Sequence, residues 1–251
     1  MDYLKTDALV LRARDFSKTS QVISVLTLRY GKRALLAKGS RRPGNAFEGP
    51  FDTLHRGELV FMPRQRASLD LATEFALDTA HRGIRSDPRR IRAAMAVVEL
   101  VDKSTAVEDR CPELYRLATA TLERMDSDPA HWLWMYRVAF ELGVLEHLGR
   151  DPQLGHCVVC RRPRPAGRSA LVDVDLGGVV CRGCRRGPSR RHLLRAVTLD
   201  WLDNLKRGTL KSVDSPGDES IIRKNAESFL RKALEWSLER RLVTLSLKQD
   251  I

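Results

Sequence analysis

Four of the five cysteines stand in two pairs whose spacing is typical of metal ligands. Two residues separate Cys157 from Cys160 and Cys181 from Cys184, and 20 residues lie between the pairs. Both thiolates of such a turn can face one metal ion, and two turns complete a tetrahedron. Because four cysteines leave no coordination position open, the pattern predicts one zinc ion with a structural role and no catalytic role.

A redox-active dithiol is the alternative interpretation of any single C-x2-C pair. Two pairs at this spacing favour a zinc-ribbon-like module over two redox centres. His156 adjoins a ligand but is surplus to the four cysteines, and Cys111, which precedes Pro112, is expected to be a buried or partly buried thiol.

The segment around the cysteines is rich in arginine. Residues 155–195 hold ten arginine and two aspartate residues, a net charge of +8. Zinc with four thiolates is itself negative, so some arginines can serve only to neutralise the site, and a merely solvated face is the other alternative. The remaining guanidinium groups suit bidentate contacts with phosphate. The predicted DNA contacts in this segment are Arg161, Arg162, Arg182, Arg185 and Arg186.

A second basic segment lies near the start of the chain. Residues 1–80 hold 13 basic and nine acidic residues, and no acidic residue occurs between positions 29 and 47. Phe16 and Tyr30 lie in turn regions beside basic residues, where a ring can stack on a base for about 1–3 kcal/mol. The predicted phosphate contacts here are Arg12, Arg14, Arg29, Lys32, Arg33, Lys38, Arg41 and Arg42.

The charge of the whole chain supports a polyanionic partner. Lys and Arg number 44 against 32 Asp and Glu in 251 residues, a formal net charge of +12. A charge of this sign and size favours nucleic acid, and an acidic membrane surface is the weaker alternative. No apolar run approaches the roughly 18 residues of a membrane span, and the first residues carry no signal-peptide core. We therefore expect a cytoplasmic, nucleoid-associated protein.

The first eighty residues are predicted to form a small β-barrel. Strands are expected at 7–13, 21–29, 32–38, 54–62 and 67–78 from their apolar content and the turns between them. Alternation in the last strand predicts that Leu69, Leu71, Thr73, Phe75 and Leu77 share its buried face. Five short strands fit an OB-type barrel, and an SH3-like barrel would give a similar strand count.

The rest of the chain is predicted to form helices on both sides of the cysteine segment. Asp87 and Asp128 each precede a proline, which predicts two helix N-termini, and Pro112 is expected to open a third helix. Gly149 is expected to end a helix. A short helix is predicted from a cap at Thr198 to Gly208, and a longer one from about 219 to 241.

These elements predict a multidomain α+β protein. Residues 1–80 form an OB-fold nucleic-acid-binding barrel, 81–154 the first part of a helical domain, 155–195 an inserted four-cysteine zinc-ribbon-like module, and 196–251 the C-terminal part of the helical domain. No nucleotide-binding loop, dinucleotide motif or H-E-x-x-H motif occurs, so we expect no enzymatic activity.

Three stretches resemble the family of the bacterial DNA repair protein RecO. The first runs from Ala8 to Pro43 and includes Leu26-Thr27-Leu28-Arg29-Tyr30-Gly31-Lys32. The second includes Phe140-Glu141-Leu142-Gly143 and continues to Cys160, and the third is Gly177-Gly178-Val179-Val180-Cys181 with Cys184. Lys18 replaces a common acid, Arg161 stands where glycine usually follows the first cysteine pair, and the last fifty residues match loosely.

The resemblance implies an N-terminal OB-fold, a helical domain and a zinc module that some members lack. It also implies binding of single- and double-stranded DNA, annealing of complementary strands, and partnership with RecR. With RecR, such a recombination mediator helps RecA to load onto DNA coated by single-strand-binding protein. The alternative from another class is a zinc-ribbon transcription or translation factor that binds RNA or polymerase.

Overall fold

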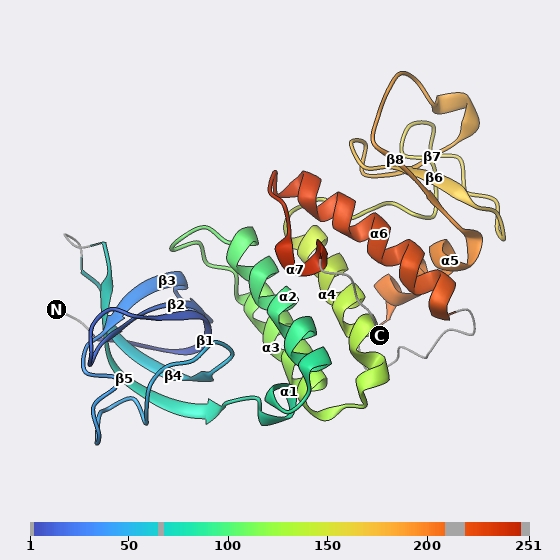
Figure 1. Cartoon of the computed structure of the whole chain (residues 1–251). Coiled ribbons are helices and arrows are strands. Elements are labelled where there is room, and N and C mark those ends of the chain that lie inside the picture. The colour runs from blue at the N-terminus through green and yellow to red at the C-terminus, as the bar shows by residue number, and fades with distance from the viewer. Residues whose placement is uncertain (1–2, 65–67, 209–218, 247–251) are drawn as a thin grey trace. The chain divides into compact units, whose positions relative to one another are not determined.

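The computed structural model describes residues 3–64, 68–208 and 219–246 (Figure 1). The chain forms two compact units, Met1–Ala130 and His131–Ile251. The first unit contains a β-barrel and three helices, and the second contains four helices and a small β-sheet. The finer division of the chain at residues 80, 154 and 195 stays a prediction.

Five strands close the N-terminal barrel. They are β1 (Leu4–Asp15), β2 (Gln21–Thr27), β3 (Gly31–Ala37), β4 (Arg56–Met62) and β5 (Asp70–Thr79). The order around the barrel is β1-β2-β3-β5-β4, with β3 and β5 parallel and the other pairs antiparallel. This is the arrangement of an OB-type barrel, so the predicted fold class is confirmed.

The interior of the barrel is filled by inward-facing apolar side chains from every strand. Val10, Ile23, Val25 and Leu35 are fully buried, as the period of two residues in a strand requires. Phe61 is also buried in this core, and the half-buried ring of Tyr30 packs edge-on against it with ring centres 5.7 Å apart.

The prediction of which side chains of β5 face the core is wrong in the first half of the strand. Ala72 and Phe75 face the core, whereas Leu71 and Thr73 remain half-buried. The pairing with β4 steps from Val60–Glu74 to Phe61–Ala72, so the strand register shifts within β5. Such a bulge adds one residue to one strand and reverses the faces beyond it, which simple alternation does not anticipate.

Three helices complete the first unit: α1 (Arg82–Arg85), α2 (Pro88–Ser104) and α3 (Pro112–Ser127). Asp87 caps α2 by accepting a hydrogen bond from the backbone N–H of Arg89, and Pro112 opens α3, as predicted. The predicted cap at Asp128 is wrong, because its backbone N–H bonds the carbonyl of Arg124 and thereby ends α3.

The helices of the second unit are α4 (Leu133–His147), α5 (Ala196–Arg207), α6 (Glu219–Ser237) and α7 (Val243–Ser246). A 3-10 turn at Ala130–Trp132 precedes α4. Both α4 and α5 pack against α6, which buries Ile222, Ala226 and Phe229. None of the helices in the described ranges is long and apolar enough to cross a membrane.

Two of the predicted helix boundaries in this unit are confirmed, and two are wrong. Gly149 follows α4 with φ +67°, and its N–H bonds the carbonyl of Glu146, as in a glycine-terminated helix. Gly208 ends α5. Thr198 is not the cap of α5, because the helix starts earlier and buries this side chain, and α6 ends before residue 241 at Ser237.

A three-stranded sheet lies in the cysteine segment. It consists of β6 (Ala170–Asp173), β7 (Gly178–Val180) and β8 (Arg191–Leu194), in the order β7-β6-β8. Cys181 and Cys184 directly follow β7, and the sheet contacts α6 through β8.

Candidate metal centre and nucleic-acid surfaces

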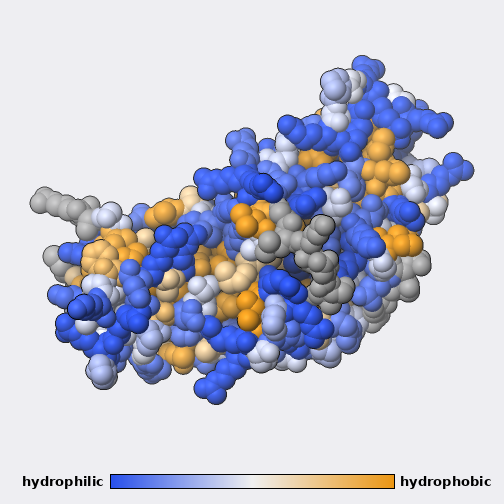
Figure 2. Space-filling model, in the orientation of Figure 1, coloured by the Kyte–Doolittle hydropathy of each residue, from blue (hydrophilic) through white to orange (hydrophobic). Residues whose placement is uncertain are grey.

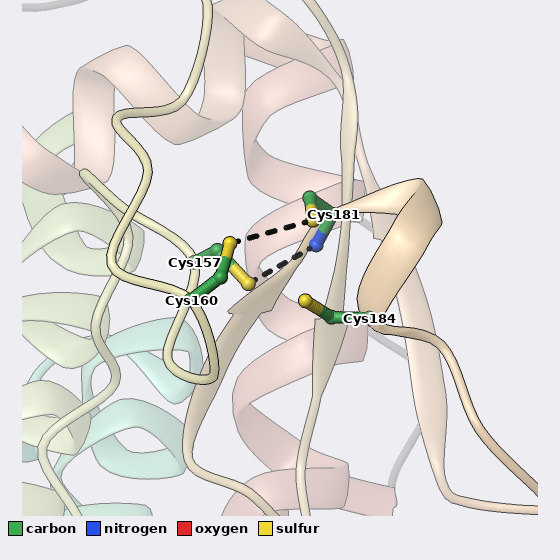
Figure 3. A group of neighbouring side chains, drawn as sticks. All are labelled: Cys157, Cys160, Cys181 and Cys184. Atoms are coloured by element: carbon green, nitrogen blue, oxygen red, sulfur yellow. Dashed lines mark hydrogen bonds between the residues drawn. The ribbon is translucent and has the colours of Figure 1, made fainter.

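Two tight turns bring the four cysteines together. In Figure 3 the sulfur atoms of Cys157, Cys160, Cys181 and Cys184 converge on one point, and all four lie within 4.8 Å of one another. The sulfur atoms of Cys160 and Cys181 are 3.7 Å apart. Sulfur atoms placed about 2.3 Å from one tetrahedral zinc ion would lie about 3.8 Å apart. The cluster can therefore hold a metal ion of this size.

Backbone hydrogen bonds hold the two turns side by side. The N–H of Val158 bonds the carbonyl of Val179 at 2.9 Å, and the N–H of Val179 bonds the carbonyl of Gln153 at 2.8 Å. The approach at β7 is close, because a Cβ atom on Gly178 would lie 2.6 Å from the carbonyl oxygen of Gln153. Glycine at 178 therefore lets the first turn pair with the strand that leads into the second.

The electrostatics of the cluster favour a bound cation. Burial raises the pKa of the Cys157 thiol, but backbone N–H groups of Cys160, Cys181 and Val159 outweigh burial and lower the pKa to about 6. Contacts with the sulfur atoms of Cys181 and Cys160 raise the pKa of Cys184 to about 12. One thiolate is thus stabilised by the backbone, whereas further negative charges oppose one another until a metal ion neutralises them.

The fifth cysteine is separate from this cluster. Cys111 precedes α3, is 3 % exposed, and its thiol lies 3.6 Å from the carbonyl oxygen of Asp109. Burial raises the pKa of this thiol to about 11. The prediction of a buried thiol at Cys111 is therefore confirmed, and its raised pKa makes it unreactive.

The arginines of the cysteine segment fall into two groups. Arg164 is buried and contacts Asp200 and the carbonyl oxygen of Leu154, so it anchors the segment to α5. Arg190 and Arg191 form ion pairs with aspartates of the same segment. The five predicted DNA contacts are all exposed and make no ion pair within the described residues. We call these residues the module surface: Arg161, Arg162, Arg182, Arg185 and Arg186.

On the barrel, the loops at one end bring several predicted contacts together. The N–H of Arg41 bonds the carbonyl of Thr19 at 3.1 Å, which joins the loop after β3 to the turn between β1 and β2. Arg41 also pairs with Asp15 at this end. Lys18, which sequence reasoning did not select, lies in the same turn. We call these exposed residues the loop surface: Arg14, Phe16, Lys18, Lys38, Arg41 and Arg42.

The other predicted barrel contacts are separated from the loop surface. Arg29 and Tyr30 lie in the turn at the opposite end of β2. Lys32 donates a hydrogen bond of 2.6 Å to the carbonyl oxygen of Asp102, and Arg33 contacts Asp70 and Glu108. Their side chains are only 13 % and 15 % exposed.

Side chains that already bind residues of the same chain are less available to contact phosphate. Arg12 is also paired, with Asp102, although it remains half exposed. Lys32 holds the barrel to Asp102 of α2, Arg33 holds it to Glu108 in the segment that follows α2, and Tyr30 packs against the barrel core. Among the residues at this end of β2, Arg29 is the exposed cation.

The face of the molecule seen in Figure 2 is mostly hydrophilic, with small apolar patches. Exposed large apolar side chains such as Phe16, Val107 and Leu193 are scattered along the sequence. Isolated exposed apolar residues are normal on a protein surface.

The sequence matches one family along most of its length. Residues 1–78 match the family described as "Recombination protein O N terminal", and residues 85–246 match "Recombination protein O C terminal". These two ranges cover both the barrel and the cysteine segment.

Individual relatives agree with the family match. The DNA repair protein RecO of Rhodopirellula baltica is 34% identical over 79% of this chain and 72% of its own. The DNA repair protein RecO of Anaeromyxobacter sp. strain K is 32% identical over 100% of this chain and 98% of its own. That of Desulfitobacterium hafniense strain Y51 is 27% identical over 98% of this chain and 92% of its own. The chain, with its OB-type barrel and its four-cysteine cluster, belongs to the RecO family of DNA repair proteins.

Proposed function

We propose that this chain is a recombination mediator that binds single- and double-stranded DNA and anneals complementary strands. The observation that carries the proposal is the presence of two exposed basic surfaces, the loop surface and the module surface, on different elements of one chain. DNA strands repel each other through their phosphates. Two cationic surfaces on one chain can each bind a strand and raise the effective concentration of one strand near the other.

The partners in this proposal follow the family. With RecR, the protein assists RecA to load on DNA that is coated by single-strand-binding protein, at the nucleoid. The RecO relatives support this role through their name as DNA repair proteins. The alternative role as a zinc-ribbon transcription or translation factor is not favoured by the family matches.

The chain acts in this proposal without catalysis. Phosphate and base contacts require no bond to be made or broken, and the nucleotide-binding motifs are absent from the sequence. Incubation with ATP, or with labelled DNA and Mg²⁺, should release no more product than a heat-treated control. A turnover that survives repurification would overturn this part of the proposal.

The metal in this proposal is one zinc ion per chain, held by Cys157, Cys160, Cys181 and Cys184. Four thiolates suit zinc, and a closed ligand set stabilises the fold and leaves no position for substrate. Metal analysis should find one equivalent of zinc, and Cys181→Ser should lower both metal content and melting temperature. Cys111→Ser, at a distant thiol, is the control and should keep the metal. A metal-free chain of native stability would contradict the assignment.

Salt titration tests the proposed mode of DNA binding. The logarithm of the duplex association constant should fall with the logarithm of salt concentration by about 0.9 per phosphate contacted. The triple variant Arg182→Ala, Arg185→Ala, Arg186→Ala should reduce that slope, and scrambling the DNA sequence should change little. Arg92→Ala, an exposed cation on α2 outside both surfaces, is the matched control. A flat salt dependence or a strong sequence preference would refute the mode.

A further inference from the structure

A second basic site lies in the C-terminal unit, and its lining includes none of the four clustered cysteines. A groove of 820 Å³ runs between the β6–β8 region and the C-terminal half of α6. This volume is in the range of clefts that hold a small ligand or a part of a larger one. Its lining includes the four cations Arg150, Arg190, Arg191 and Lys232 and the indole of Trp236.

The floor of the groove is a guanidinium placed on an aromatic ring. The Cζ atom of Arg150 lies 4.6 Å from the centre of the Trp236 ring. Arg150 is exposed, whereas Trp236 is half-buried, so the guanidinium is the solvent-accessible part of the pair. Trp236 also lines a small adjoining pocket together with Phe229 and Leu145. Nucleic-acid bases stack on aromatic rings and on guanidinium planes that are held in this way.

Two cations near the Arg150–Trp236 pair, Lys232 and Arg190, can bind phosphate. Lys232 has no carboxylate within ion-pair distance in the described residues, and its Nζ lies 3.4 Å from Nδ1 of His192. Burial and then the charge of Lys232 lower the pKa of His192, so the ring stays neutral and can accept from the lysine. Arg190 pairs with Asp175, but its side chain is 67% exposed, and solvent weakens such a pair.

The four cations of the lining outnumber its two acidic residues, Glu235 and Glu239. Glu235 accepts a hydrogen bond from the backbone N–H of Leu242, which lies just beyond α6. Arg191 is held by Asp173 and by the carbonyl oxygens of Arg186 and Gly187, so it shapes the groove wall. Glu239 is the remaining acid of the lining, against Arg150, Arg190 and Lys232.

We infer that this groove binds a nucleotide of single-stranded DNA, with a base stacked on the Arg150–Trp236 pair and phosphate at Lys232 and Arg190. The inference rests on the proposed DNA-binding function and assigns to it a subsite that discriminates between strands. In a duplex the bases are stacked on each other inside the helix, so they cannot stack on Arg150. The subsite therefore contributes to single-strand binding and contributes little to duplex binding.

The test is a comparison of Arg150→Lys and wild type with oligo-dT and with a duplex of equal length. Lysine keeps the charge but lacks the planar group that stacks. The variant should weaken single-strand binding at least about fivefold, the lower end of the effect of losing one stacked base, and should change duplex binding less than twofold. Trp236→Leu should give the same pattern, and oligo-dT should change the tryptophan fluorescence of the wild type more than that of Trp236→Leu.

Arg231→Lys is the matched control, because Arg231 lies on α6 but lines a different cavity. It should bind both DNA forms like the wild type. Equal affinities of Arg150→Lys and wild type for oligo-dT would overturn the subsite and leave the proposed function standing. Equal weakening toward single strand and duplex would also overturn it, since that pattern reflects phosphate contacts alone. A wild-type chain that binds no DNA would overturn both proposals.

Discussion

Arg161 occupies a backbone conformation that favours glycine. Its φ is +64°, directly after Cys160, and its N–H bonds the carbonyl of Cys157 at 2.9 Å to close the first metal-binding turn. A side chain in this left-handed region costs about 1–2 kcal/mol. The sequence resemblance marks position 161 as one where relatives carry glycine, and the φ angle supplies the physical reason.

Replacing Arg161 with glycine should therefore stabilise the protein. We expect Arg161→Gly to raise the free energy of unfolding by about 1 kcal/mol, or the melting temperature by about 2–4 °C. Arg162→Gly is the control, because the neighbouring residue does not have a positive φ. Calorimetry of metal-loaded protein measures both. A melting temperature of Arg161→Gly at or below that of wild type would show that the arginine is favoured there by something other than its backbone.

His81 links the barrel to the first helix through a buried ring. Its Nδ1 lies 2.7 Å from the carbonyl oxygen of Leu54, the residue is 1% exposed, and Nε2 has no hydrogen-bond partner among the described residues. Burial lowers the pKa of His81 below its ordinary value, although the bond to Leu54 and the charge of Asp126 act in the opposite direction. The folded state therefore favours the neutral ring.

The sign of the resulting pH dependence follows from that lowered pKa. In the unfolded chain His81 takes up a proton below about pH 6.5, whereas the folded chain resists protonation until lower pH. Stability from this group is complete above about pH 6.5 and is lost as the pH falls through the lowered pKa of the folded chain. His81→Asn, which keeps a donor for Leu54 and tolerates the positive φ of +48°, should flatten this part of the stability curve. Denaturant unfolding between about pH 5 and 7.5 measures it; identical slopes in variant and wild type would refute the assignment.

At the scale of elements, the pairing of the Cys157–Cys160 turn with β7 assembles the four-cysteine cluster. A Cβ atom on Gly178 would lie 2.5 Å from Cγ1 of Val158, whereas nothing lies within 4 Å of a Cβ atom on Gly183. Gly178→Ala should cost about 1–3 kcal/mol through overpacking and should lower zinc content. Gly183→Ala should retain both stability and zinc. Metal analysis with thermal unfolding tests the pair, and equal metal content in the two variants would contradict the account.

Local signals in the sequence predict some elements and miss others for identifiable reasons. Asp87 and Asp128 both precede proline, but only Asp87 caps a helix, because α3 runs on until the N–H of Asp128 closes its last turn. Alternation locates β5, but the register shift against β4 that turns Ala72 inward depends on pairing between strands distant in sequence. Tertiary context decides such choices.

The four-cysteine cluster is predictable from the sequence, and the exposed basic surfaces are predictable only in part. The spacing of the four cysteines in two short turns predicts that their side chains meet, and the structure brings them together. The sequence does not show whether a basic side chain contacts a phosphate or an acidic residue of the same chain. Sequence reasoning therefore predicts Lys32 and Arg33 as phosphate contacts. In the structure Lys32 binds Asp102, and Arg33 binds Asp70 and Glu108. Sequence reasoning misses the Arg150–Trp236 pair because its members lie on separate elements and are 86 positions apart, which the sequence numbering alone does not connect.

At the scale of the whole molecule, we propose that each basic surface binds one DNA strand. The loop surface lies on the first unit and the module surface on the second. Both present exposed cations, such as Arg42 and Arg185, that form no ion pair within the described ranges. Loss of one surface should leave a chain that still binds one strand through the other. Annealing requires both strands to be bound at once, so loss of one surface should reduce the annealing rate more than the affinity for a single strand.

Strand annealing tests this central claim most directly. The rate at which two complementary labelled strands pair should be measured for wild type, for Lys38→Ala/Arg41→Ala/Arg42→Ala, and for Arg182→Ala/Arg185→Ala/Arg186→Ala, beside the affinity of each for one strand. We predict that each triple variant loses more in annealing rate than in single-strand affinity. This prediction is contradicted if the module variant anneals at the wild-type rate with an unchanged salt dependence, because the barrel alone would then bring both strands together.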